Sequence, residues 1–264
     1  MRYNVITAWI MVVILSLCGV VLPANAETAF SETIRQAPPE ITSLPGRFGK
    51  YIIFGSYEQD NDLENGPEPI EWRVLEVKDG KALVVSLYAL ELMQYHGIIA
   101  ADESVTWETW DIRAWLNGEF MEAAFTAAEK LRIPDVTVRA QWHRYSNATL
   151  GNHTQDHIFL LSLTEIEEYW PQKGSRKCSP TAYAIANYEI RNGEEWPDTE
   201  VGYKAGDKGN CNWWVRTPGE FDGSASWINR NGTIAFLNYQ NLLQLDTRNF
   251  DYGIRPAMWI DLEP

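Results

Sequence analysis

The segment from 210 to 219 constrains the fold more than any other part of the chain. It reads Asn-Cys-Asn-Trp-Trp-Val-Arg-Thr-Pro-Gly, with two adjacent tryptophans. Neighbouring side chains of a strand point to opposite faces, so Trp213 and Trp214 cannot share a face. One must enter a core, and the other must face a second layer, a loop or a ligand. Pro218 and Gly219 end the run, because proline cannot donate to a β-ladder and glycine accepts a turn. We predict that this run and a second apolar run, 253–260, are central strands of one C-terminal sheet.

Residues 1–26 have the pattern of a secretory signal. Arg2 is their only charged residue, an apolar stretch follows, and Ala24-Asn25-Ala26 forms an A-x-A cleavage pattern. We predict cleavage after Ala26, export to the cell envelope or the extracellular space, and no membrane segment in the mature chain. The alternative is an uncleaved anchor, because the apolar stretch is long enough to span a bilayer.

The charge balance excludes some classes of partner. The chain carries 36 acidic and 22 basic residues, and its formal net charge is −14. Such a surface repels polyanions, so we expect no binding to nucleic acid or to anionic membranes. Residues 27–47 contain prolines and few large apolar residues, which predicts an extended lead-in. The remainder, 48–264, is expected to form a single domain.

Strand and helix patterns are mixed along this domain, which indicates the α+β class. Asp79-Gly80 lies between two alternating runs and predicts a β-hairpin near the N-terminus, and Asn231-Gly232 predicts a second hairpin. Residues 106–131 have helical spacing, and Gly118 is expected to end the first of two helices there. Ser162 and Glu165 form a capping-box pattern before a short helix. Further strands are expected over 51–54, 136–138 and 158–161, and a further helix over 181–187 with Ser179-Pro180 as its start.

Several sequence blocks occur together in an order that resembles one bacterial family. The blocks are Phe-Gly-Ser-Tyr-Glu-Gln-Asp at 54–60, Ile-Glu-Trp-Arg-Val-Leu at 70–75, Trp-Leu-Asn-Gly at 115–118, Phe-Leu-Leu-Ser at 159–162, Lys-Cys-Ser-Pro-Thr-Ala-Tyr-Ala at 177–184, Trp-Trp-Val-Arg-Thr-Pro-Gly at 213–219 and Gly-Ile-Arg-Pro-Ala at 253–257. They resemble the exported domain-of-unknown-function family 6273, in which the last two blocks read WWLRSPG and GVRPA.

That family is similar in layout to C-type-lectin-like domains and to formylglycine-generating (sulfatase-modifying) domains. The resemblance implies a mixed sheet with flanking helices and an N-terminal hairpin, and it implies a fold rather than an activity. The catalytic relatives hold copper with a closely spaced cysteine pair, whereas Cys178 and Cys211 are far apart in this sequence. The tripeptides of calcium-dependent lectins are also missing. We therefore expect no cofactor.

Cys178 and Cys211 are the two cysteines that remain after the predicted cleavage. In an exported protein they are free to form a disulfide. The alternative is a pair of reduced, buried thiols.

Two segments have weak metal-like patterns. His153 and His157 would share a face on a helix, with His143 as a third ligand, but the segment is rich in Asn, Gly and Thr. Acids alternate at Asp60, Asp62 and Glu64, an echo of a calcium loop that is only partial, because Asn65 occupies the position where that loop has glycine. We favour exposed loop histidines and a solvated acidic loop, and we expect no metal site.

The aromatic C-terminal sheet supplies the candidate ligand site. Trp214, Arg216 and Trp227 are proposed to floor an exposed pocket, because tryptophan rings stack on sugars and arginine or asparagine contacts their hydroxyls. Asn229 and Arg255 complete the candidate set. The alternative, which we favour for Arg216 and Arg255, is a buried arginine tied to a carboxylate or to loop carbonyls.

The sequence contains no nucleophile elbow, phosphate loop or HExxH motif. We therefore predict a secreted, non-catalytic binding module for an extracellular or cell-envelope ligand, either a glycan or a protein. One alternative is an extracellular hydrolase or oxidase with an unrecognised site, and another is a structural envelope protein. A pocket with two converging titratable groups of shifted pKa would favour the enzyme.

Overall fold

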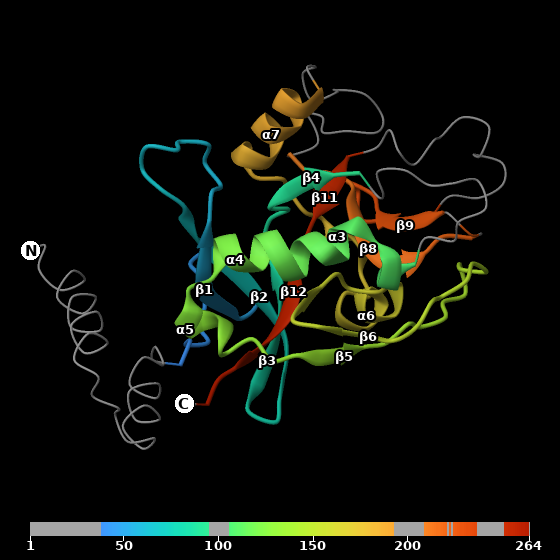
Figure 1. The fold of residues 1–264 in the computed structure, drawn as a ribbon, viewed down its shortest axis with the longest axis horizontal. Coiled ribbons are helices and arrows are strands. Elements are labelled where there is room, and N and C mark those ends of the chain that lie inside the picture. Colours follow the sequence, from blue (N-terminus) through green and yellow to red (C-terminus); the bar gives the residue numbers. More distant parts are fainter. Residues whose placement is uncertain are drawn as a thin grey trace, which may run out of the picture. The chain divides into compact units, whose positions relative to one another are not determined.

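The computed structural model describes residues 38–94, 106–192, 209–220, 222, 224–236 and 251–263. The predicted signal sequence 1–26 and residues 27–37 of the lead-in lie outside these ranges. All described residues fall within one compact unit and combine helices with several sheets, which makes the chain an α+β protein. Figure 1 shows the arrangement of its elements. None of the helices within the described ranges has the length and apolar character needed to cross a bilayer.

The first sheet contains the predicted N-terminal hairpin. Its strand order is β1-β2-β3-β12-β7, and all its pairs are antiparallel. The strands are β1 (Tyr51–Tyr57), β2 (Glu68–Lys78), β3 (Lys81–Ser86), β12 (Ala257–Asp261) and β7 (Ile158–Phe159). Asp79 and Gly80 join β2 to β3 with φ angles of 49° and 71°, the positive values that a tight hairpin turn requires. The first hairpin prediction is therefore confirmed.

The second sheet has β8 (Trp213–Pro218) at its centre, as the sequence predicts. Its order is β10-β9-β8-β11-β4, with β10 (Ile234–Phe236), β9 (Ala225–Ile228), β11 (Tyr252–Ile254) and β4 (Glu91–Met93). β8 and β11 are parallel neighbours, and β9 and β10 form the second predicted hairpin. All six residues of β8 are buried. A separate two-stranded sheet consists of β5 (Val136–Val138) and β6 (Thr154–Asp156).

The prediction of one continuous last strand over 253–260 is wrong. The run divides at Arg255-Pro256 into β11, which belongs to the second sheet, and β12, which belongs to the first. Pro256 has no backbone N–H, so a ladder cannot continue through it. The C-terminal run therefore connects the two sheets.

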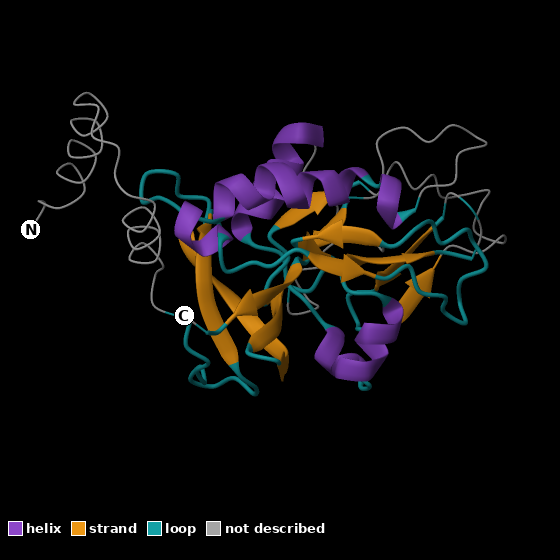
Figure 2. Cartoon of the chain, turned by 60° about the horizontal axis from the view of Figure 1, so that its bottom comes forward, coloured by secondary structure: helices purple, strands orange, loops and turns teal. Residues whose placement is uncertain are grey.

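The predicted helix start at Ser162 is confirmed, but the predicted stop at Gly118 is wrong. They are η1 (Trp107–Thr109), α3 (Asp111–Trp115), the π-helical turn η2 (Leu116–Phe120), α4 (Met121–Ala124), α5 (Ala127–Lys130), α6 (Leu163–Tyr169), η3 (Lys173–Arg176) and α7 (Ala182–Asn192). Gly118 does not end a helix but lies inside η2, and the break comes later, where Thr126 caps α5. Ser162 caps α6 as predicted. Thr181, rather than Ser179, accepts a hydrogen bond from the first turn of α7. Figure 2 shows α3, α4 and α5 on one side of the strands and α6 on the other.

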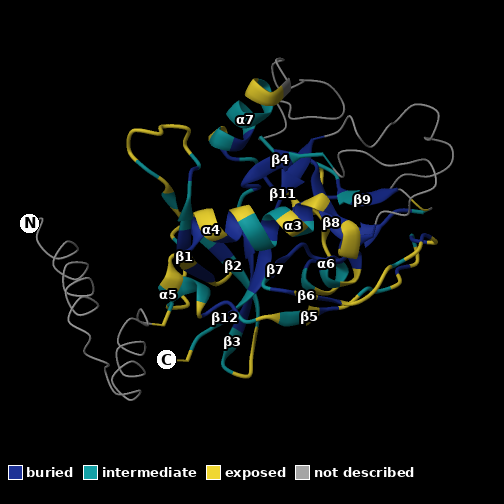
Figure 3. Cartoon of the chain, in the orientation of Figure 1, coloured by how far each residue is buried: buried dark blue, intermediate teal, exposed yellow. Residues whose placement is uncertain are grey.

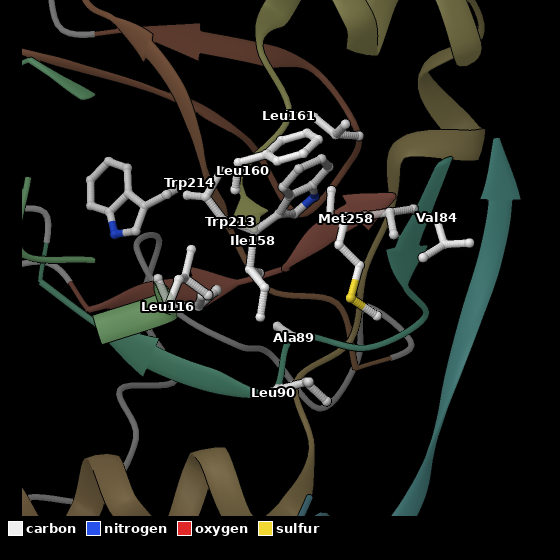
Figure 4. Packing of buried hydrophobic residues seen from close by; sticks show 14 of the residues in the cluster. Val84, Ala89, Leu90, Leu116, Ile158, Leu160, Leu161, Trp213, Trp214 and Met258 are labelled. Atoms are coloured by element: carbon white, nitrogen blue, oxygen red, sulfur yellow. The ribbon is translucent and has the colours of Figure 1, made fainter. Parts of the chain in front are cut away.

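The adjacent tryptophans of β8 do point to opposite faces, and both are buried. The Trp213 ring packs edge-on against Trp170 at 6.3 Å between ring centroids, while the Trp214 ring lies 4.3 Å from that of Tyr252. Figure 4 shows the two indoles on different sides of β8 within the apolar cluster. Figure 3 shows that β8 and β11 are buried along their length. The core thus encloses the second sheet on both faces.

Candidate functional site

Arg216 forms the charged centre of the candidate site. It lies on β8, and its guanidinium binds the carboxylate of Glu165 in the first turn of α6, with Nη1–Oε2 at 2.5 Å and Nη2–Oε1 at 2.9 Å. Nη1 also donates to the carbonyl of Leu160 at 2.7 Å. Arg216 is 6% exposed, and its Nε is buried without a hydrogen-bond partner among the described residues. These contacts hold the guanidinium plane in one orientation.

Glu165 is held as an ionised carboxylate. Burial alone would raise its pKa, but the charge of Arg216 and hydrogen bonds from Arg216 and Ser162 outweigh burial, and the net pKa lies below the usual value. The Oε2 atom of Glu165 accepts from both the backbone N and the Oγ of Ser162, at 2.7 and 3.0 Å. The capping box that starts α6 therefore also orients the partner of Arg216.

The Arg216–Glu165 pair opens into a cavity of about 140 Å³. The cavity lies where β5, β7, β8, β12 and α6 meet. Its lining residues are Val136, Thr137, Val138, Arg139, Gln141, Phe159, Glu165, Arg216 and Trp259. A second cavity of about 10 Å³ adjoins it and shares Arg139, Gln141 and Arg216 with it. Arg216 thus lines both hollows.

Part of the cavity lining comes from β5 and the residues that follow it. Thr137 and Arg139 are exposed there, and Gln141 is half-buried and accepts from Ser162 Oγ through its side-chain oxygen at 3.3 Å. Trp259, on β12, is half-buried and brings an indole ring to the cavity. The cavity therefore combines one aromatic ring with hydroxyl, amide and guanidinium groups.

The family comparison covers this site. The model of the family described as "Domain of unknown function (DUF6273)" matches residues 79–262. The chain belongs to DUF6273. The matched part includes every residue that lines the cavity and begins after β1 and β2. No curated protein and no solved structure matches the chain. The C-type-lectin-like layout that the DUF6273 resemblance implies therefore stays a prediction.

The sequence predicts that Trp214, Arg216 and Trp227 form the floor of an exposed pocket. They do not form one in the structure. Trp214 is 1% exposed, and its indole N–H donates to the carbonyl of Met93 at 2.9 Å. Trp227 is half-buried and packs against Trp214 and Tyr252, with ring centroids 6.2 and 5.5 Å apart. The tryptophans therefore form a packed aromatic cluster, and Arg216 alone of the three lines the cavity.

Asn229 and Arg255 also lie outside that cavity. Asn229 belongs to the β9–β10 turn, where its backbone N donates to the carbonyl of Thr233 at 2.8 Å. Arg255 is 2% exposed, and its guanidinium lies 4.6 Å from the ring centroid of Trp170 and 5.2 Å from that of Trp213. Its Nε donates to the carbonyl of Ser86, and burial lowers its pKa. Arg255 is thus a buried arginine that binds the carbonyl of the last residue of β3.

His143, His153 and His157 each contact a different partner within the described residues. β6 separates His153 from His157, so the two are not on a helix. His153 accepts from the backbone N of Ala140, and His157 Nδ1 donates to the carbonyl of Ile133 at 2.9 Å. His143 is buried, 3.3 Å from a carboxylate oxygen of Glu167. Neither His153 nor His157 belongs to a potential metal-binding group within the described ranges.

Cys178 and Cys211 come together but are free thiols in the structure. Both are buried, and the backbone N of Cys211 donates to the carbonyl of Cys178 at 2.8 Å. A hydrogen bond between the two side chains and burial both raise the pKa of Cys211. Burial opposes ionisation of Cys178 too, but that hydrogen bond and the charge of Arg255 lower its pKa overall. The predicted disulfide is not formed here and stays a prediction.

One group of acids was only partly visible in the sequence. Carboxylate oxygens of Glu58, Asp60 and Glu68 lie within 4.8 Å of one another in the β1–β2 loop, which precedes the DUF6273 match. Of the three acids singled out by their spacing, Asp60 belongs to this group, whereas Asp62 and Glu64 do not. Glu58 and Glu68 have no such spacing signal, and they become neighbours through the β1–β2 register, which pairs Tyr57 with Glu68.

Proposed function

We propose that the chain is a secreted, non-catalytic binding module that holds one saccharide unit of an extracellular or cell-envelope glycan in the Arg216 cavity. The observation that carries this proposal is the lining of the cavity, in which the Trp259 indole lies with the polar side chains of Thr137, Arg139 and Gln141 beside a fixed ion pair. Sugars are commonly recognised by an aromatic face together with a few hydroxyl-binding polar groups.

The size of the cavity favours one unit of a larger ligand. Its volume of about 140 Å³ is smaller than the roughly 300–1,000 Å³ of pockets that enclose a drug-sized molecule. A cavity of this size accepts a ring or a side chain and leaves the rest of the ligand on the surface. Arg139 and Thr137 are exposed at the cavity and are available to contact that remainder.

The electrostatics favour binding over catalysis. Glu165 is the one carboxylate among the described lining residues, whereas glycoside hydrolysis ordinarily needs two carboxyl groups across the scissile bond. Its pKa is lowered rather than raised towards neutrality, so Glu165 is a poor general acid. Its oxygens are also occupied by Arg216 and Ser162.

The location and fold that accompany this proposal rest on the sequence. Residues 1–26 support export, and the DUF6273 blocks support a C-type-lectin-like layout of the second sheet. We propose an extracellular or cell-envelope protein that uses no cofactor for binding. A protein ligand, a hydrolysed glycan and a purely structural envelope role are the competing outcomes of the experiment below.

The experiment is a glycan-array screen of residues 27–264, followed by calorimetry with the best glycan. We expect Arg139→Ala and Gln141→Ala each to weaken binding at least about tenfold, because each removes a hydrogen-bond donor aimed at the ligand. The matched control is Lys78→Ala, which removes an exposed cation outside the cavity, and it should bind like the wild type.

Three results would contradict the proposal. If the wild-type protein binds no glycan on the array, the proposal of a glycan ligand is wrong. If the Arg139→Ala, Lys78→Ala and wild-type proteins bind the glycan with equal affinity, the glycan does not bind in the Arg216 cavity. Cleavage of the bound glycan during incubation, detected by mass spectrometry, would support the extracellular enzyme instead.

A further inference from the structure

Three carboxylates meet at the β1–β2 loop, away from the Arg216 cavity. Glu58 follows the end of β1, Asp60 lies in the loop, and Glu68 begins β2. The antiparallel register pairs Tyr57 with Glu68, so the hairpin itself brings the two ends of the loop together. One oxygen from each of the three side chains lies within 4.8 Å of the other two. In Figure 3 the loop is mainly exposed where it extends beyond the hairpin.

The loop backbone holds two of these carboxylates in place. Asp60 accepts from the backbone N of Asp62 at 2.8 Å and from the side-chain amide of Asn65 at 3.0 Å. Glu68 accepts from the backbone N of Gln59 at 2.6 Å. The arrangement therefore concentrates negative charge at a fixed position.

Glu58 contributes a second, independent observation, an unsatisfied oxygen within this group. It is 9% exposed, and its Oε1 is buried without any hydrogen-bond partner among the described residues. The carboxylate of Glu58 does accept a hydrogen bond from the backbone N of Asn61 and shares one with Asp60, but Oε1 stays unsatisfied, which is unfavourable for a buried carboxylate oxygen.

The described residues provide no counter-charge for this group. None of Glu58, Asp60 and Glu68 forms an ion pair with a lysine, arginine or histidine within those ranges. Three clustered carboxyl groups can be neutralised by a shared proton or by a cation. At neutral pH a divalent cation neutralises more charge than one proton, and it also gives the buried oxygen of Glu58 a partner.

We propose that Glu58, Asp60 and Glu68 form a Ca²⁺ site that fastens the β1–β2 loop. Carboxylate and carbonyl oxygens are the ligands that Ca²⁺ takes, six to eight of them in flexible geometry, with water completing the shell. Mg²⁺ demands a near-ideal octahedron and fits an irregular loop less well. Zn²⁺ and copper favour imidazole and thiolate ligands, which this group does not contain. The three residues precede the DUF6273 match, and none of them lines the Arg216 cavity.

The test is a calcium titration of the full chain after treatment with EDTA. We expect saturable binding of one Ca²⁺ by calorimetry, weaker binding of Mg²⁺, and a rise in the thermal midpoint with added Ca²⁺. Glu58→Gln should weaken Ca²⁺ binding at least about tenfold, since it removes one charged ligand. The matched control Glu64→Gln removes a carboxylate from the same loop but not from the group, and it should bind Ca²⁺ like the wild type.

Two results would overturn the proposal. One is the absence of saturable binding by the wild-type chain up to about 10 mM Ca²⁺, which exceeds the range of about 10⁻⁴–10⁻³ M typical of extracellular calcium modules. The other is equal Ca²⁺ affinity of the Glu58→Gln and Glu64→Gln proteins. The wild-type titration alone decides the question if Glu58→Gln does not fold. A shared proton instead of a cation would appear as a thermal midpoint that Ca²⁺ leaves unchanged.

Discussion

The Arg216 guanidinium and the Glu165 carboxylate face each other through two parallel hydrogen bonds of 2.5 and 2.9 Å, which tie β8 to the start of α6. This geometry needs the flat two-point donor of arginine, which lysine cannot reproduce. The pair therefore serves two purposes, because it fixes a helix against the central strand and forms the floor of the cavity.

Arg216→Lys should destabilise the protein by about 1–3 kcal/mol, because one buried donor and its geometry are lost. Urea unfolding at neutral pH measures this change. The matched control is Arg144→Lys, since Arg144 also pairs with a glutamate, Glu167, but its side chain is 56% exposed. That control should change stability by less than about 0.5 kcal/mol. Equal effects of the two substitutions would contradict a structural role for the buried pair.

The stability that Glu165 contributes should depend on pH in a defined direction. Its pKa is lower in the folded protein than the usual 4.5, so the unfolded chain binds the proton more tightly. The contribution is therefore complete above pH 4.5 and is lost as the pH falls through the folded pKa. Urea midpoints of wild type and Glu165→Gln should differ most at neutral pH and converge in acid. A constant difference down to pH 3 would show that the carboxylate is not stabilised by its partners.

Trp214→Ala should act as a core substitution rather than a binding substitution. Trp214 is 1% exposed and stacks on Tyr252, so removal of its ring should cost about 3–5 kcal/mol. Trp142 is 64% exposed, and Trp142→Ala is the control, with an expected change below about 0.5 kcal/mol. Thermal or urea unfolding compares the two. A stable Trp214→Ala protein would contradict the packing described here.

If the chain is exported as proposed, Cys178 and Cys211 should be joined in the recovered protein, because their thiols are in contact and extracellular compartments are oxidising. Alkylation in denaturant without reductant, followed by mass spectrometry, should label neither cysteine, and prior reduction should expose both. The reduced protein should be less stable by about 3–4 kcal/mol on loop-entropy grounds. Two labelled cysteines in the unreduced exported protein would show that the pair functions as buried thiols.

Local rules predict most elements of the fold. Asp79-Gly80 predicts the first hairpin because the turn needs two positive φ angles, and Ser162 with Glu165 predicts α6 because the two side chains satisfy each other's backbone donors. The alternation of Trp213 and Trp214 follows from strand geometry alone. Gly118 misleads, because a glycine is tolerated inside a helical turn when tertiary packing continues the helix.

The candidate site is harder to predict from the sequence than the fold. Its residues depend on which faces of the strands are buried by other elements. Nothing local distinguishes Trp214, which is buried by Tyr252, from Trp259, which lines the cavity. The sequence predicts that Arg216 lies on a central strand. It does not predict the partner, because Glu165 lies on a different element, α6. Likewise, Glu58 and Glu68 become neighbours only through the pairing of β1 with β2. Residues far apart in sequence require the tertiary structure to bring them together.

The division of the C-terminal run at Arg255-Pro256 also bears on when the molecule can fold. β11 lies between β8 and β4, and β12 lies between β3 and β7, so both are interior strands of their sheets. Residues 252–261 are therefore needed to complete both sheets, and neither sheet can close before this segment is in place. The two sheets should accordingly form in one cooperative step, because a single segment of ten residues supplies an interior strand to each.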